Sequence, residues 1–93
     1  MMTKTRSGAD SDRAIPPGEM LVEELEARAM TQRQLAVRMG RPPQVVNEIV
    51  RGKKAITPET ALQLEEALGP SAEFWMGLQT TYDLILARAA RAS

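Results

Sequence analysis

Polar side chains that can hydrogen-bond to nucleic-acid bases recur at helical spacing in the middle of this chain. Gln44, Asn47 and Arg51 are three and four residues apart, so on a helix they lie along one face. A carboxamide presents a donor and an acceptor together, which matches adenine, whereas a guanidinium matches guanine or a phosphate. Val46 and Ile49 fall on another side of the same helix. The pattern indicates a helix that is buried on one face and contacts nucleic acid with another.

Positive charge is concentrated around these residues. The chain has 12 Lys and Arg residues against 12 Asp and Glu residues, so its formal net charge at pH 7 is zero. Residues 31–54 depart from this balance, because Glu48 is their single anion and they contain the six cations Arg33, Arg38, Arg41, Arg51, Lys53 and Lys54. A local excess of this kind is typical of a surface that binds the phosphate backbone of nucleic acid.

The residues of this segment divide according to the part of DNA that each would contact. Four cations at its edges are suited to phosphates and would supply affinity rather than specificity: Arg33, Arg41, Lys53 and Lys54. Gln44 and Asn47 are the candidates for base edges, and Arg51 could reach guanine or a phosphate. Pro43 and Val45 are placed to touch a thymine methyl group.

Glu48 is the exceptional member of this face. Its carboxylate could accept a hydrogen bond from cytosine. A carboxylate that faces phosphates is unfavourable, however, so we favour the alternative that Glu48 pairs with Arg51 or a neighbouring base.

Local signals place these residues on two short helices joined by a turn. Thr31 can cap the first helix by accepting from the backbone near Gln34, whose side chain can reach back to the cap. Gly40 tolerates positive φ and ends this helix, and Pro43 suits the first position of the next one. Residues 31–54 therefore predict a helix-turn-helix, a motif that places its second helix in the major groove of DNA.

Three further helices are expected around this motif. The first covers residues 19–29, where four apolar residues form one stripe: Leu21, Val22, Leu25 and Ala29. Thr57 and Pro58 begin the next helix and Gly69 ends it. Ser71 caps the last, which runs from about residue 72 to about residue 90. No strand-like alternation extends beyond a few residues, so the fold class is all-α.

We expect the chain to form one folded domain over residues 15–93, preceded by a tail. Residues 1–14 contain almost nothing to bury and are expected to be disordered. The last helix carries more apolar surface than so small a domain can cover, which indicates pairing with the same helix of a second chain. The residues assigned to this dimer interface are Phe74, Trp75, Leu78, Tyr82, Ile85 and Leu86.

The composition argues against several classes of function. The chain has no Cys and no His, which excludes disulfides, zinc fingers, thiol nucleophiles and imidazole catalysis. No cofactor, metal or catalytic site is expected, because no nucleophile has a base partner. No apolar segment has the length of a membrane span and the polar start lacks a signal peptide, so a cytoplasmic location is expected. Single Phe, Trp and Tyr residues offer no platform for stacked bases, which favours duplex DNA over single strands.

Three segments of the chain resemble motifs of known protein families. The segment from Thr31 to Gly52 resembles the helix-turn-helix of the lambda-repressor-like (XRE) regulators. Two flanking motifs are more specific: Gly-Lys-Lys-Ala-Ile-Thr-Pro-Glu over residues 52–59 and Glu-Phe-Trp over residues 73–75. Both look like those of HigA antitoxins, and the resemblance extends over residues 15–86.

The resemblance implies a five-helix, lambda-repressor-like domain that acts in a type II toxin–antitoxin system. Such an antitoxin neutralises a HigB-like, mRNA-cleaving toxin and, as a homodimer on an inverted repeat of operator DNA, represses its own operon. The resemblance also assigns Gln32 to a phosphate. Pro42 departs from the family, since many relatives have Ser or Thr there to cap the second helix, a hydrogen bond worth about 1 kcal/mol. A stand-alone regulator without a toxin is the main alternative, and a protein–protein adaptor without DNA binding is another.

Overall fold

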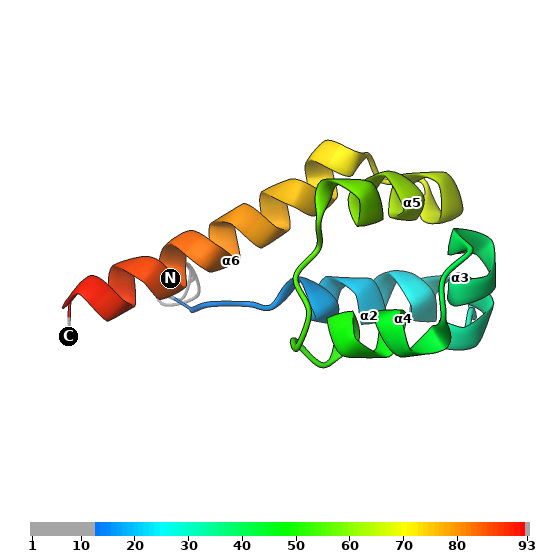
Figure 1. Cartoon of the computed structure of the whole chain (residues 1–93), viewed down its shortest axis with the longest axis horizontal. Helices are drawn as coiled ribbons and strands as arrows, with labels where there is room; N and C mark the ends of the chain where they lie inside the picture. Colours follow the sequence, from blue (N-terminus) through cyan, green and yellow to red (C-terminus); the bar gives the residue numbers. More distant parts are fainter. Residues whose placement is uncertain (1–12, 93) are drawn as a thin grey trace, which may run out of the picture.

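The computed structural model describes residues 13–92, and this part of the chain contains five α-helices and no strand (Figure 1). The helices are α2 (Pro17–Ala27), α3 (Gln32–Met39), α4 (Pro43–Val50), α5 (Pro58–Leu68) and α6 (Ala72–Ala92). The all-α prediction is therefore confirmed. The tail expected to be disordered lies outside the described residues except for Arg13 and Ala14, which belong to no helix.

The predicted helix boundaries of the helix-turn-helix are confirmed in atomic detail. At the start of α3, the Thr31 hydroxyl accepts from the Gln34 backbone N–H at 3.0 Å, and the Thr31 N–H donates to Gln34 Oε1 at 2.9 Å. These reciprocal bonds satisfy two backbone donors that a helix start leaves unpaired. Gly40 ends α3 with φ of 68°. Pro43 begins α4, and its cap Pro42 makes no side-chain hydrogen bond, as its chemistry requires.

The prediction for α2 was wrong at both ends. The helix begins at Pro17 rather than Glu19, because Pro17 itself fits the first helical position. It ends at Ala27, and Ala29 follows with φ of 52°, outside the helix. The N–H of Met30 donates to the Leu25 carbonyl at 2.9 Å and thereby closes the helix end. Glycine usually occupies this left-handed position, so the alanine gave no signal that the helix would stop there.

The core forms between α2, α3, α4, α5 and the first part of α6. Its largest fully buried side chains are Trp75, Leu21, Leu35, Ile49, Ile56, Leu64 and Val46. The assignment of Trp75 to a dimer interface was wrong, because this side chain is 0% exposed and packs in the core of one chain. Periodicity alone marked an apolar stripe on α6, and a stripe can face its own domain as well as a second chain.

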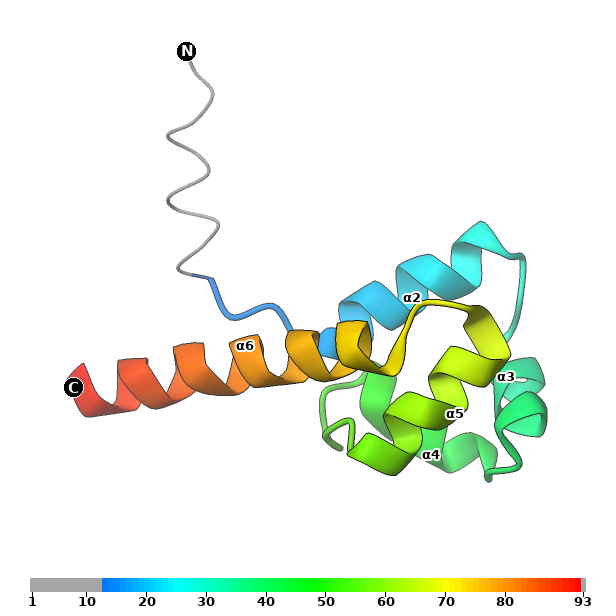
Figure 2. The same ribbon diagram turned by 90° about the horizontal axis from the view of Figure 1, so that it is seen from above.

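The second half of α6 projects beyond the other helices. Its first turns pack against α5 and α2, and the rest extends away from the domain in both views (Figures 1 and 2). Leu84 and Leu86 are each 45% exposed there. The expectation that α6 leaves apolar residues uncovered is confirmed. Within residues 13–92, no helix combines the length and the apolar character that crossing a membrane requires.

Candidate nucleic-acid interface

The second helix of the motif, α4, has one buried face and one open face. Val46 and Ile49 are 0% and 2% exposed, so they fix the helix against the core. Gln44 and Arg51 are exposed, and Asn47 is half-buried. The structure therefore brings the predicted base-contacting residues onto one face, as their spacing requires.

The position of α4 is set from behind by the first turn of α2. Gly18 is buried, and a Cβ atom added to it would lie 2.3 Å from the Ile49 carbonyl oxygen and 2.8 Å from the Val50 Cα. Only glycine lets the two helix backbones approach this closely. Gly18 could not be identified from the sequence, because nothing local to the chain signals a contact with residues so far along it.

Asn47 and Gln32 form a polar contact between the two helices of the motif. Asn47 Nδ2 donates to Gln32 Oε1 over 3.3 Å. Gln32 thereby uses its acceptor within the protein, while its amide N–H groups are the donors that a phosphate oxygen needs. The pair links a candidate phosphate contact on α3 to a candidate base contact on α4.

Glu48 lies beside Lys54 and Gln44 rather than Arg51. Its Oε1 is 4.0 Å from Lys54 Nζ, and its Oε2 accepts a hydrogen bond of 3.2 Å from Gln44 Nε2. The pairing with Arg51 was wrong, because the chain turns back after α4 and brings the lysine to the carboxylate. The N–H groups of Lys53 and Lys54 both donate to the Glu48 carbonyl, at 2.8 and 3.2 Å. Glu48 therefore orients the Gln44 amide, and its own charge is partly balanced.

The cations assigned to phosphates differ in how firmly they are held. Arg33, Lys53 and Lys54 are exposed at the edges of the motif. Arg41 is half-buried, and its Nη1 donates to Gln63 Oε1 of α5 at 2.9 Å, which fixes the direction of the guanidinium. Gln63 was not identified from the sequence, because it lies on a different helix.

The two candidates for apolar contact with DNA lie in different environments. Pro43 is exposed at the start of α4. Val45 is half-buried and packs against the core, so only part of its side chain is open to a ligand. Of the two, Pro43 is the better placed to touch a thymine methyl group.

Comparison with known proteins identifies the helix-turn-helix. A family model described as helix-turn-helix matches residues 21–75. Virulence-associated protein I of Dichelobacter nodosus is 39% identical over 88 residues, which are 94% of this chain and 82% of that protein.

Two solved structures share the fold over most of their length. An addiction module antidote protein of the HigA family from Coxiella burnetii superimposes with a TM-score of 0.81 at 40% identity, over 86% of this chain and 88% of that one. Antitoxin HigA from Pseudomonas aeruginosa, solved with the higBA promoter, gives a TM-score of 0.81 at 37% identity over the same shares.

Proposed function

Because this chain belongs to the HigA-type antitoxins of the helix-turn-helix family, we propose that it represses its own operon and neutralises a HigB-like, mRNA-cleaving toxin. Residues 15–93 would be the DNA-binding domain, and the protein would act by binding rather than by catalysis. A cytoplasmic location is part of this proposal, because operator DNA and mRNA would both be met there.

The open face of α4 is the observation that carries the DNA-binding proposal. Gln44 and Asn47 lie along it, Arg51 directly follows its last residue, and the exposed Lys53 and Lys54 lie beyond its C-terminal end. In this arrangement α4 would enter the major groove, where Gln44 and Asn47 would contact base edges. Lys53 and Lys54 would contact phosphates at its C-terminal end.

Substitutions on α4 and on the following loop should affect DNA binding in different ways. Gln44→Ala and Asn47→Ala each remove a base contact, so operator affinity should fall by about 1–3 kcal/mol and random-DNA affinity should change little. Lys54→Ala removes a phosphate contact, so both affinities should fall equally and the salt dependence should flatten. Titrations of both DNAs at several salt concentrations measure this, and equal losses on both DNAs for all three variants would contradict the assignment.

A homodimer is the second part of the proposal, and a groove beside α6 supports it. The groove, of about 480 Å³, lies between α6 and the first residues of α2, with Ile15, Met20, Leu78, Tyr82 and Ile85 among its lining residues. It is open, so a second α6 helix could occupy it.

Charge at the two ends of this surface is complementary. Glu23 lines the groove, as do Glu19 and Arg13, which are paired with each other at 3.9 Å; Arg88 and Arg91 are exposed near the end of α6. An antiparallel pairing of two α6 helices that cross near Leu84 would bring each pair of arginines toward the glutamates of the other chain. Such a dimer would bind an inverted repeat with half-sites about one helical turn apart.

The toxin partner is the third part of the proposal, and co-expression tests it. The adjacent reading frame should encode a small basic protein that co-purifies with this chain and stops cleaving mRNA in the complex. Deleting residues 1–14 tests whether the toxin binds the tail or the folded domain. Unchanged recovery of the toxin would exclude the tail as an essential contact. If the chain binds its operator but the adjacent product neither co-purifies nor is inhibited, a stand-alone regulator is the correct function.

A further inference from the structure

The loop that follows α4 is held at both of its ends. This loop, residues 51–57, carries Lys53 and Lys54 and is called the lysine loop below. Its first half is bound to α4 through the Glu48 carbonyl. Its second half is bound to α6, because the Ile56 N–H donates to Gln79 Oε1 over 2.8 Å.

The hydrogen bond between Ile56 and Gln79 lies below the surface of the domain. Ile56 is 2% exposed and Gln79 is 7% exposed, so both partners are buried. A buried backbone N–H that loses its acceptor must find another one or move to solvent. The lysine loop therefore depends on a side chain of α6 for its position.

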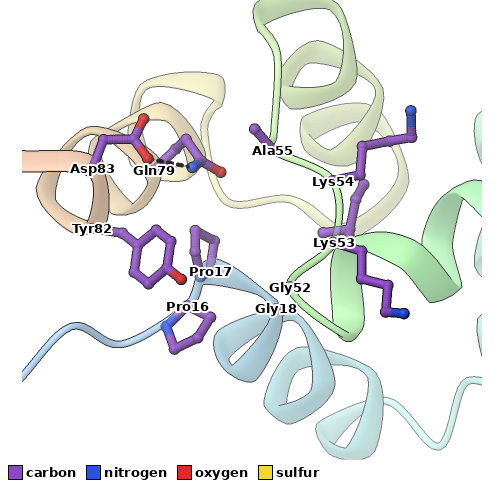
Figure 3. A pocket seen from close by; sticks show the side chains of 11 residues that line it. Pro16, Pro17, Gly18, Gly52, Lys53, Lys54, Ala55, Gln79, Tyr82 and Asp83 are labelled. Carbon is purple, nitrogen blue, oxygen red and sulfur yellow. Dashed lines mark hydrogen bonds between the residues drawn. The ribbon is translucent and has the colours of Figure 1, made fainter. Parts of the chain in front are cut away.

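Asp83 determines which end of the Gln79 amide faces the loop. Gln79 Nε2 donates to Asp83 Oδ1 over 3.0 Å, one turn further along α6. An ionised carboxylate only accepts hydrogen bonds, so the amide nitrogen must face Asp83 and the amide oxygen must face Ile56. Figure 3 shows this pair on the α6 side of a small cavity of about 170 Å³ that also borders the lysine loop and the start of α2.

The lysine side chains leave the loop on its other side. In Figure 3, Lys53 and Lys54 point away from Gln79, and the loop backbone passes between them and α6. A shift of the loop away from α6 would therefore move the ammonium groups relative to α4. Two restraints therefore set the distance from a base contact on α4 to a phosphate contact on the loop: the bonds from the Lys53 and Lys54 N–H groups to the Glu48 carbonyl, and the bond from Ile56 to Gln79.

We propose that Gln79 is a positioning residue for the contacts between the lysine loop and the DNA backbone. The inference rests on the proposed DNA binding and deepens it. Gln79 touches no DNA itself, and acts by holding Ile56 while Asp83 fixes the orientation of its amide. It thereby connects α6, the helix proposed for dimerisation, to the phosphate-binding loop of the same chain.

Replacing Gln79 by Met tests this, because Met has a similar length and offers no comparable acceptor. We expect operator and random-DNA affinity to fall together, by about tenfold, and the slope of log affinity against log salt to decrease by about 1 to 2 as phosphate contacts are lost. Asn47→Ala is the matched comparison, since it should lower operator affinity alone and leave the salt slope unchanged.

A double variant distinguishes positioning from a general loss of structure. Gln79→Glu with Asp83→Asn exchanges the donor and the acceptor, so an oxygen still faces Ile56 and position 83 now donates. It should restore affinity and salt slope to nearly the wild-type values. Hydrogen exchange of the Ile56 amide should be fast in Gln79→Met and slow in the double variant.

A second single variant keeps the test open if Gln79→Met does not fold. Asp83 is exposed, so Asp83→Ala should fold. It should raise the hydrogen-exchange rate of the Ile56 amide and lower DNA affinity by less than Gln79→Met does. Unchanged affinity and salt slope in a folded Gln79→Met variant, or in an Asp83→Ala variant with fast Ile56 exchange, would overturn the inference while leaving the proposed function intact. Failure of the wild-type chain to bind operator DNA would overturn both.

Discussion

Replacing Gly18 by Ala should lower the free energy of unfolding by at least about 3 kcal/mol, a large part of the roughly 5–15 kcal/mol of a domain of this size. The added Cβ would lie 2.3 Å from the Ile49 carbonyl oxygen and 2.6 Å from that of Val50. Both are backbone atoms, so no side chain can rotate to make room. Thermal unfolding followed by circular dichroism should show a melting temperature lower by at least about 12 °C.

Gly77→Ala is the matched control, because it makes the same chemical change inside another helix. A Cβ atom at Gly77 meets nothing within 4 Å, and alanine is the better helix former. This variant should gain about 0.5–1 kcal/mol of stability. A Gly18→Ala variant that melts within a few degrees of the wild type would contradict the close approach of α2 and α4.

The same contact gives Gly18→Ala an effect on DNA binding. Any molecules of the variant that stay folded must separate α2 from the C-terminal end of α4, which moves Asn47 and Arg51 relative to the exposed cations. We therefore expect weaker operator binding even at temperatures where the variant is folded, measured with the same titrations as for the α4 variants.

The parts of the structure that were predictable from the sequence are those that short-range signals determine. Thr31 with Gln34, Gly40 and Pro43 act within a few residues of themselves, so their roles follow from backbone hydrogen bonding and allowed φ. The open stripe of α4 was equally predictable, because its spacing is a property of one helix. Ala29 shows the limit of such signals, since the left-handed position was occupied by a residue that does not favour it.

The contacts between distant segments could not be predicted from the sequence. Gln79 contacts Ile56 at a separation of 23 residues, and Arg41 contacts Gln63 at 22. A glutamine on a helix gives no sign of its partner until the helices are packed. The burial of Trp75 has the same cause, because spacing indicates an apolar face without indicating what covers it.

Replacing Leu86 by Glu should convert the proposed dimer into a monomer and lower the affinity for a full inverted repeat by at least about 100-fold. Leu86 is 45% exposed on the projecting half of α6, so the charge should not unfold the chain. In a dimer that charge would be buried against apolar side chains without a partner. A dimer binds its second half-site at high effective concentration, an advantage of about 10²–10⁴ that a monomer lacks. Sedimentation and operator titration measure the two effects, and the affinity for a single half-site should be unchanged.

Leu62→Glu is the control for this substitution, since Leu62 is a leucine of similar exposure, 56%, on another helix, α5. It should leave both the dimer and operator binding intact. The charge complementarity is tested separately by Arg88→Glu, which should weaken the dimer, and by its combination with Glu23→Arg, which should restore it. A Leu86→Glu variant that sediments as a dimer would show that the two chains meet elsewhere. If Arg88→Glu combined with Glu23→Arg restores the dimer, α6 of each chain must lie in the groove of the other.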